Sequence, residues 1–267
     1  MLIKPEILVC PPTYYTVDYE INPWMDIKDQ PDSTKAQNQW LRMVNYYQNL
    51  SLKIHQIKPL PKLPDMVFTA NAGLICGNNF IASNFRHPQR QPEKELFINW
   101  FKKKNFKVHQ LSSEYFFEGQ GDALFVNDVL FAGYRFRSDI QTHQQISQII
   151  NREVISLELV NSEFYHLDTC FCPLGDNAAL YYPGAFDEYG NKVIKNMIPN
   201  LIPVSENDAR KFCCNAMVID KKIIANEMSK TLRNQLSNSG FKIIEMGTDN
   251  FMKAGGSIKC MSLIINI

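Results

Sequence analysis

The chain has 267 residues, of which 45% are hydrophobic and 21% are charged, as in ordinary globular proteins. Its 28 lysines and arginines are balanced by 27 aspartates and glutamates, so we expect neither nucleic acid nor an anionic membrane as a partner. No apolar run approaches the roughly 20 residues that span a bilayer, and the N-terminus lacks the apolar stretch of a secretion signal.

Seven cysteines are present, an odd number without the spacing of a disulfide framework. In a chain of this length such a set is typical of a reducing compartment, and we predict a cytoplasmic protein. Cys170 and Cys172 would point to the same face of a strand, where a disulfide between them is strained. We therefore expect these two thiols to be strand residues without a chemical role.

A strand–turn–strand pattern recurs along the chain, with two apolar runs around a turn signal such as GNN, ND, GDN or DKK. One pattern is split, with one half at 5–12 and the other at 260–267. The four intact patterns span 71–83, 122–134, 168–182 and 215–227. The residues that open successive patterns lie 45 to 51 residues apart, a regularity that indicates an internal repeat.

A segment with helical spacing of its apolar residues follows each pattern, and a short β-like run follows each helix. The predicted helices cover 38–50, 95–104, 140–150, 185–198 and 227–240. The chain thus divides into five ββαβ units of about 50 residues, none of which can bury its apolar face alone. We predict an α/β fold, a five-bladed α/β propeller whose units close into a ring with the helices outside, as a single domain over 1–267.

Equivalent positions of the five units meet near the axis of such a ring, so the residues that open the hairpins should face one central cavity. The prediction brings together side chains that are far apart in the sequence, namely Asn71, Asp122, His166 with Asp168, and Cys260.

Cys260 follows two glycines at the mouth of a predicted strand, where a thiol can act as a nucleophile. The alternative is a buried cysteine that packs as a small hydrophobic residue, which is the commoner role. His166 lies two residues before Asp168 in a predicted strand, which places both side chains on one face. Its imidazole could shuttle protons for the cysteine, and a hydrogen-bonded core histidine is the alternative.

Three carboxylates, Glu118, Asp122 and Asp168, would crowd the same cavity, which is costly unless a cation neutralises them. A metal ion is one candidate cation, but the cysteine pairs at 170 and 172 and at 213 and 214 lack the spacing of a zinc site, and we predict no metal. A planar guanidinium is the other candidate, because it presents five donors to carboxylates. The acidic pocket with a thiol therefore suits arginine or a related compound.

Arg90 and Arg137 are the candidate partners of a substrate carboxylate, which arginine can hold with two parallel hydrogen bonds. For each of them a solvated surface position is the alternative, and the commoner case. Segment 13–37, rich in Tyr, Asp and Pro, is a candidate flap over the site.

Four motifs together resemble the superfamily of enzymes that modify guanidino groups: FTAN, FEGQGD, HLDT and a C-terminal GG followed by a cysteine. The resemblance covers the whole chain. Members of the superfamily include arginine deiminases, dimethylargininases and amidinotransferases, and they share the five-bladed α/β propeller called the pentein fold. The resemblance implies Cys260 as nucleophile, His166 as general acid and base, Glu118 as the partner of the histidine, and Asp168 as a guanidinium ligand.

One departure from the superfamily lies in FTAN, because arginine deiminases tend to have FTRD there, with an acidic side chain where this chain has Asn71. With INPWM and FYHLDTCFCPL, the chain looks most like the catalytic domain of cyanobacterial-type arginine dihydrolases, which convert arginine into ornithine, carbon dioxide and two ammonia molecules. That similarity implies that Asn22 and Asn71 contact the substrate, with Arg90 and Arg137 at its carboxylate and Asp122 among the binding acids. It implies a small-molecule substrate without a cofactor, and it leaves a homo-oligomer open.

Three alternatives stay open on the sequence alone. A dimethylargininase or an arginine deiminase would release citrulline. A non-catalytic module would bind arginine without needing the thiol of Cys260, and a metalloprotein would use the cysteine pairs.

Overall fold

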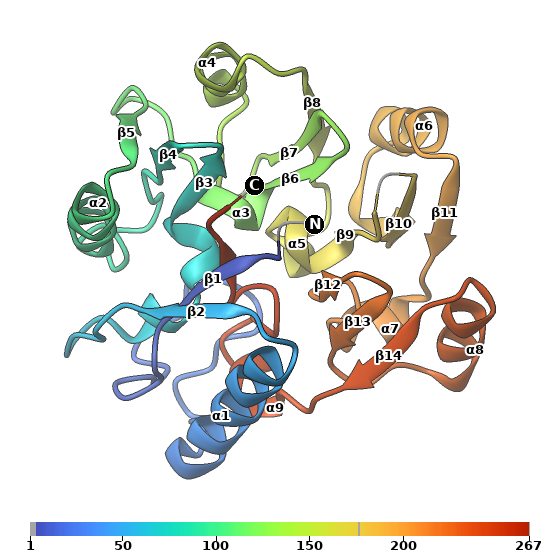
Figure 1. The fold of residues 1–267 in the computed structure, drawn as a ribbon, viewed down its shortest axis with the longest axis horizontal. Helices are drawn as coiled ribbons and strands as arrows, with labels where there is room; N and C mark the ends of the chain where they lie inside the picture. Colours follow the sequence, from blue (N-terminus) through green and yellow to red (C-terminus); the bar gives the residue numbers. More distant parts are fainter. Residues whose placement is uncertain (1–3, 176, 267) are drawn as a thin grey trace.

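The structure, a computed structural model, describes residues 4–175 and 177–266. Five three-stranded sheets are set around a central axis, each with a helix on its outer side (Figure 1). The first strand, β1 (Glu6–Val9), lies near the axis in that view. This arrangement confirms the predicted five-bladed α/β propeller.

Four of the sheets are built from consecutive strands and share one topology, an antiparallel hairpin followed by a parallel third strand. A helix crosses over between the second and third strand of each sheet. The four sheets are β3 (Gly73–Cys76), β4 (Asn79–Ala82) and β5 (Lys107–Gln110); β6 (Ala123–Val126), β7 (Val129–Tyr134) and β8 (Val154–Glu158); β9 (Phe171–Pro173), β10 (Ala178–Tyr181) and β11 (Asn200–Pro203); and β12 (Met217–Ile219), β13 (Lys222–Ala225) and β14 (Lys242–Glu245).

The fifth sheet joins the two ends of the chain. Its central strand, β1 (Glu6–Val9), pairs antiparallel with β15 (Leu263–Ile264) and parallel with β2 (Lys53–Gln56). The pairing of the first and last strands closes the ring, as the split repeat predicted.

The five crossover helices are α1 (Ser33–Asn49), α2 (Glu93–Lys103), α4 (Gln141–Ile150), α6 (Glu188–Met197) and α8 (Lys230–Asn238). Three of them begin after a capping side chain, because Asp32, Asp187 and Ser229 each accept a hydrogen bond from the backbone N–H three residues on. The cap at Asp32 explains why α1 begins earlier than the predicted helix at 38–50.

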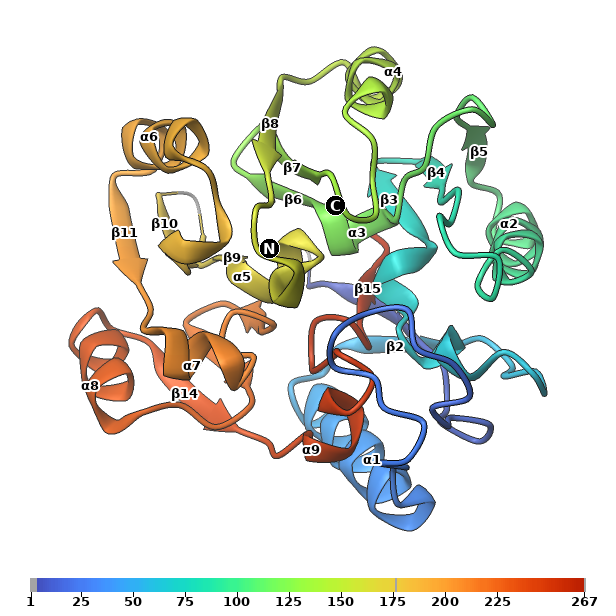
Figure 2. The same cartoon turned by 180° about the vertical axis from the view of Figure 1, so that it is seen from behind.

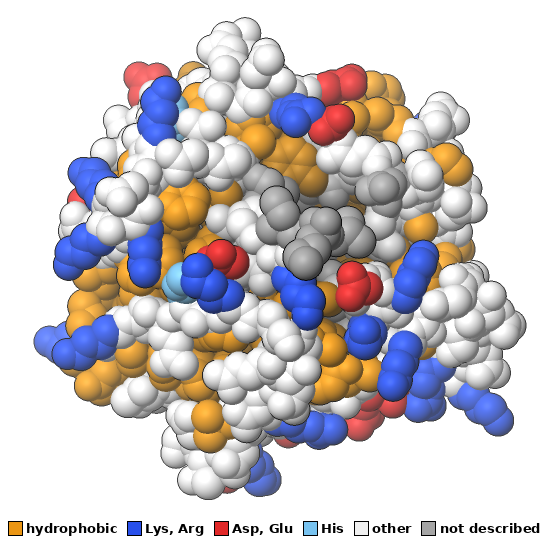
Figure 3. All heavy atoms as spheres, viewed as in Figure 1, with side chains coloured by type: hydrophobic (Ala, Val, Ile, Leu, Met, Phe, Trp, Pro, Cys, Tyr) orange, Lys and Arg blue, Asp and Glu red, His pale blue; other side chains and the backbone are white. Residues whose placement is uncertain are grey.

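The apolar stripe of each helix packs on its own sheet. In α2, Phe97, Ile98 and Phe101 are buried, and the ring of Phe101 stacks on Phe80 of β4 with 3.7 Å between centroids. Burying one such side chain contributes about 2–3 kcal/mol, so these helices hold the blades in place. On the face shown in Figure 3, lysines and arginines are interspersed with acidic and uncharged side chains. Within the described residues, no helix is both long and apolar enough to cross a membrane.

Short helical turns precede the hairpins at the centre of the ring. They are the 3₁₀ turn Thr69–Ala72, α3 (Gly119–Asp122) and α5 (Leu167–Cys170). The prediction that His166 and Asp168 share a strand with Cys170 is therefore wrong, and of the two cysteines predicted in that strand only Cys172 lies in one, β9. His166 instead precedes a helical turn whose first residues include Asp168.

Candidate active site

The helical turns of neighbouring blades meet at the axis, where α3 contacts both the turn Thr69–Ala72 and α5. The view from behind in Figure 2 places α3 and α5 at the centre of the ring. Gly119 permits this approach, because its φ is +60° and a Cβ there would lie 2.6 Å from the backbone nitrogen of Gly73. The FEGQGD motif therefore lets two blades touch and carries Glu118 into the centre.

His166 is buried and bonded to Glu118, with 2.8 Å between Nε2 and Oε2. Arg137 donates from Nη1 to the same carboxylate oxygen at 3.0 Å. Burial by itself would raise the pKa of Glu118, but the Arg137 charge and the His166 hydrogen bond hold that pKa well below its usual range. The ionised Glu118 is an acceptor for the Nε2–H of His166, and Nδ1 of the same ring faces Asn71.

Cys260 lies in a turn before β15, beside Asp168 and Asn215. Its sulfur is 3.3 Å from Oδ2 of Asp168 and accepts a hydrogen bond from Nδ2 of Asn215 at 3.0 Å. Burial, followed by the Asp168 charge, raises the pKa of the Cys260 thiol well above its usual range. Burial also raises the pKa of Asp168 to about 7, against the opposing charge of Lys259. The pair therefore holds a proton near neutral pH, and a cation bound beside it would favour the thiolate.

Asn71 is oriented by Arg90, whose Nη1 donates to Oδ1 of the amide at 2.9 Å. This bond turns the amide nitrogen towards Nδ1 of His166, 3.5 Å away. Arg90 also donates to both carboxylate oxygens of buried Glu93 and to the backbone oxygen of Asp65. Only one of its five N–H groups is left without an acceptor in the described part of the chain. Arg90 can thus offer a substrate one donor, whereas the sequence analysis expected a bidentate clamp.

Arg137 keeps more of its donors free. Besides Glu118 it bonds only the backbone oxygen of Ile21, from Nη2 at 2.9 Å, among the described residues. Its guanidinium carbon lies 4.5 Å from the ring centroid of Tyr165. Three N–H groups remain, so Arg137 is better placed than Arg90 to meet a carboxylate.

Asp122 does not line the cavity. Its Oδ2 accepts from the hydroxyl of Ser138 at 2.6 Å, and its Oδ1 accepts from the backbone nitrogen of Leu167 at 3.1 Å. Burial raises its pKa to about 6. Both oxygens bond neighbouring protein groups and so hold the segment after His166, and the substrate contact expected for Asp122 stays a prediction.

A narrow cavity of about 10 Å³ lies beside these side chains. Its walls include Asn71, Arg90, Arg137, Tyr165, Gly255 and Cys260. The segment around Asn22 covers it, because Asn22 lines the cavity and donates from Nδ2 to the backbone oxygen of Ala254 at 3.1 Å. Trp24 fastens the same segment by donating from Nε1 to the backbone oxygen of Glu163 at 2.7 Å. Ile21, Asn22 and Met25 of the predicted flap at 13–37 thus form part of the cavity wall.

Asp65 is a cavity residue that the sequence analysis missed. Its Oδ2 accepts from the hydroxyl of Tyr19 at 2.9 Å, and its Oδ1 has no hydrogen-bond partner among the described residues. Burial raises its pKa. It lies in the 3₁₀ turn Pro64–Val67, outside the repeated hairpins. The signal that could have found it is an acid inside the apolar run that leads into FTAN.

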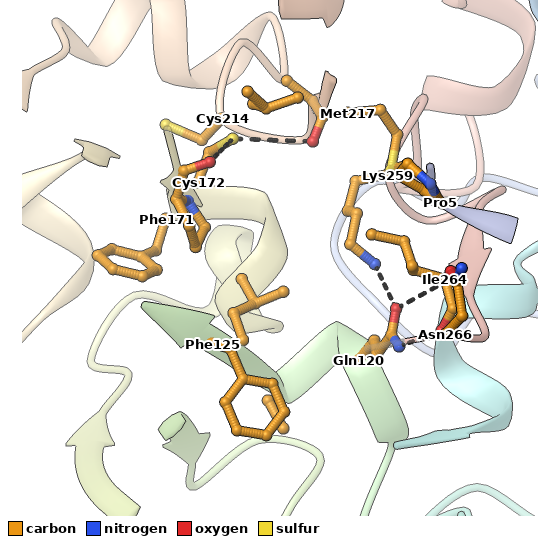
Figure 4. Close-up of a pocket in the computed structure, with 15 residues that line it drawn as sticks. Pro5, Gln120, Phe125, Phe171, Cys172, Cys214, Met217, Lys259, Ile264 and Asn266 are labelled. Atoms are coloured by element: carbon orange, nitrogen blue, oxygen red, sulfur yellow. Dashed lines mark hydrogen bonds between the residues drawn. The ribbon is translucent and has the colours of Figure 1, made fainter. Parts of the chain in front are cut away.

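A second cavity, of about 300 Å³, is lined by residues of β6, β9, β12 and β15 (Figure 4). Its walls are mainly apolar and include Phe125 and Phe171. The ammonium of Lys259 lies on one wall and donates to Oε1 of Gln120 at 3.1 Å. Cys260 is not among the described residues that line it, so it is separate from the cavity that holds the thiol.

The cysteine pairs are not arranged as a metal centre. The sulfurs of Cys213 and Cys214 are 4.0 Å apart, and all seven cysteines are unpaired thiols. Across residues 4–175 and 177–266, no group of three or more His, Cys, Asp and Glu side chains is placed to hold a metal ion.

The family described as N,N dimethylarginine dimethylhydrolase, eukaryotic, matches residues 13–267. Among curated proteins, the chain is 45% identical to the bifunctional arginine dihydrolase/ornithine cyclodeaminase ArgZ of Synechocystis, over 96% of this chain and 37% of that protein. It is 35% identical to the N(G),N(G)-dimethylarginine dimethylaminohydrolase of Mycobacterium tuberculosis, over 96% of this chain and 84% of that protein. The chain thus spans well under half the length of the bifunctional relatives it matches.

Solved structures give the same neighbours. The N-terminal domain of ArgZ, an arginine dihydrolase captured with its substrate, superposes with a TM-score of 0.95 at 44% identity, over 98% of each chain. A dimethylarginine dimethylaminohydrolase that carries an adduct with 4-chloro-2-hydroxymethylpyridine superposes with a TM-score of 0.82 at 20% identity, which is a likeness of fold.

Proposed function

The chain belongs to the N,N dimethylarginine dimethylhydrolase family of eukaryotic type, and we propose that within this family it is an arginine dihydrolase. The proposed reaction takes L-arginine and two water molecules to ornithine, carbon dioxide and two ammonia molecules. The likeness to the arginine dihydrolase domain of the bifunctional relatives supports this choice.

One observation carries the proposal: the cavity is lined by the thiol of Cys260 and by a buried carboxylate, with a second buried carboxylate in contact with the sulfur, and each carboxylate has one oxygen without a hydrogen-bond partner among the described residues. The unpartnered oxygens are Oδ1 of Asp168, beside the Cys260 sulfur, and Oδ1 of Asp65 in the cavity wall. A buried carboxylate oxygen without a donor is costly, so both positions favour a cationic ligand. Arginine carries two cations, a guanidinium and an α-ammonium, one for each acid.

The cavity therefore suggests one orientation of the substrate. The guanidinium lies at Asp168 and Cys260, and the α-ammonium lies at Asp65. The α-carboxylate then meets the free donors of Arg137, with Asn22 above it in the covering segment. This assignment gives a partner to both carboxylate oxygens that lack one among the described residues.

In the proposed first half-reaction, the thiol proton of Cys260 passes to Nδ1 of His166, and the thiolate attacks the guanidinium carbon. The C–N bond to one terminal nitrogen then breaks as the imidazolium gives its proton to that nitrogen. Ammonia leaves, and a thiouronium adduct remains on the sulfur. Glu118 stabilises the imidazolium that forms, because its carboxylate is held ionised by Arg137.

In the second half-reaction, His166 takes a proton from water, the resulting hydroxide attacks the adduct, and the C–S bond breaks. A deiminase would release citrulline here, whereas a dihydrolase retains the ureido group for a second attack by Cys260. Loss of the ornithine nitrogen, followed by hydrolysis of the carbamoyl group left on sulfur, yields ornithine, the second ammonia and carbon dioxide. These steps use only a thiol, an imidazole and water, so they require no cofactor or metal.

Asn71 offers a physical reason for the second round. Arg90 fixes its amide with Nδ2 turned towards His166 and the cavity. An amide N–H can donate to the carbonyl of a neutral ureido group, which an aspartate at this position would repel.

The test is a mass balance on arginine with the purified protein. We expect two ammonia molecules and one ornithine per arginine, no turnover by Cys260→Ser, and a larger citrulline fraction from Asn71→Asp. An unchanged ornithine-to-citrulline ratio in Asn71→Asp would show that the explanation for Asn71 is wrong. One ammonia per arginine in the wild type would refute the dihydrolase assignment.

A dimethylarginine dimethylaminohydrolase is the second candidate, favoured by the family match and by the mycobacterial relative. Incubation with arginine and with dimethylarginine separates the two. The second candidate would turn over dimethylarginine faster than arginine and release dimethylamine and citrulline, whereas an arginine dihydrolase would turn over arginine faster.

The remaining assignments follow from the closed ring and the thiols. Pairing of β1 with β15 supports a single domain over 1–267, with a small molecule as its substrate. Seven unpaired cysteines support a reducing, cytoplasmic environment.

A further inference from the structure

Asn215 joins the fourth blade to the turn that carries Cys260. Its buried side chain donates from Nδ2 to the Cys260 sulfur at 3.0 Å and to the backbone oxygen of Asp168 at 3.1 Å. Its Oδ1 accepts from the backbone nitrogens of Ser257 and Cys260, both at 3.1 Å. An amide has two N–H donors and two acceptor sites, and all four are engaged here.

The place of Asn215 in the repeat explains why it reaches the sulfur. It opens the fourth hairpin pattern, at the position that Asn71, Asp122 and Asp168 hold in other blades. Its backbone oxygen also accepts from the nitrogen of Lys259 at 3.2 Å, so main chain and side chain hold the same turn. The amide therefore cannot rotate away from the sulfur without breaking several other hydrogen bonds.

We propose that Asn215 is a positioning residue that fixes the Cys260 sulfur and stabilises its thiolate by hydrogen bonding. The inference rests on the proposed role of Cys260 as nucleophile. A hydrogen bond to an ionised acceptor is stronger than one to a neutral acceptor, so the amide favours the thiolate over the thiol. Asp168, the other neighbour of the sulfur, opposes the thiolate when it is ionised. Among the described side chains, Asn215 supplies the donor that offsets this repulsion.

The substitution Asn215→Asp tests this directly, because an aspartate keeps the oxygen that Ser257 and Cys260 need and removes the donor to sulfur. The readout is the rate at which iodoacetamide alkylates Cys260 without substrate, measured against pH by mass spectrometry of the Cys260 peptide. We expect alkylation at neutral pH to slow about tenfold or more and its midpoint to move to higher pH. Asn215→Ala should move the midpoint in the same direction, and it serves if the aspartate variant folds poorly.

Asn226→Ala is the matched control. Asn226 is another buried asparagine that ties the C-terminal segment to the fourth blade, donating to the backbone oxygen of Lys211 at 2.9 Å and accepting from the nitrogen of Thr248 at 3.1 Å. Asn226 does not bond the Cys260 sulfur, so the Asn226→Ala variant should have a lower melting temperature and an unchanged alkylation midpoint of Cys260.

Two results would overturn the inference: folded Asn215 variants with the wild-type midpoint, or an equal shift in Asn226→Ala. Because the measurement needs no arginine, it is separate from the test of function. A wild-type protein that fails to consume arginine would refute the proposed function while the alkylation profile still reported on Asn215.

Discussion

Replacing Asp168 with asparagine should abolish activity and stabilise the fold at alkaline pH. Asp168 is fully buried, and burial raises its pKa from 3.8 to about 7. The folded state therefore binds this proton more tightly than the unfolded chain does. Its contribution to stability is complete below about pH 4 and is lost as the pH rises to about 7. An asparagine cannot ionise, so the variant escapes this loss.

The size of the effect follows from the pKa. A pKa raised by about three corresponds to about 4 kcal/mol at 1.36 kcal/mol per pKa unit. We expect about half of this, since side chains and water relax around a buried charge. A gain of about 2 kcal/mol at pH 8 would raise the melting temperature by about 4–8 °C in a chain of this size.

The assay is urea and thermal unfolding of the wild type and Asp168→Asn between pH 4 and 8.5. The difference in the free energy of unfolding between the two should widen from pH 4 to 7 in favour of the variant and then level off. Asp128→Asn, at an exposed carboxylate, is the control and should show no such widening. A difference that stays flat with pH, or that widens in favour of the wild type, would refute the reasoning.

Two further substitutions test the site. Glu118→Gln removes the negative charge that His166 and Arg137 both contact. We expect kcat to fall about 100-fold or more, while calorimetry still detects arginine binding. An unchanged kcat would contradict the role of Glu118. Gly121→Ala would put a methyl group 2.2 Å from Nδ2 of Asn71 and so displace the amide. We expect a native circular dichroism spectrum, a lower kcat and more citrulline among the products. Wild-type kinetics and products would show that the reaction does not depend on this position of the Asn71 amide.

The ring was predictable because its signals are local. Each hairpin carries its own turn residues, such as the GNN turn in which Gly77 has a φ of +57°, and the spacing of these turns reveals the repeat. The starts of the helices were predicted less accurately, because a capping residue such as Asp32 lies several residues before the apolar positions that mark the helix in the sequence. The repeat alone predicted that Asn71, Asp122, His166 with Asp168, and Cys260 face one cavity, whereas the pairing of Glu118 with His166 was implied by the family resemblance and is present in the structure.

What the sequence did not reveal depends on which side chains meet in the folded chain, between blades and within one. The helical turn after His166 is held by Asp122, which bonds the nitrogen of Leu167 from 45 residues away. Arg90 is largely engaged by Glu93, and no motif marks that pair. Such pairings are decided by which side chains face each other in the folded ring, and a one-dimensional spacing does not encode that.

The most direct measurement on the proposed chemistry is the mass of the protein quenched in acid during turnover of arginine. A covalent adduct on the peptide that contains Cys260, present in the wild type and absent from Cys260→Ser, is the predicted result. Arginine consumption that persists in Cys260→Ser, or an adduct on another cysteine, would contradict the assignment of this thiol as the nucleophile.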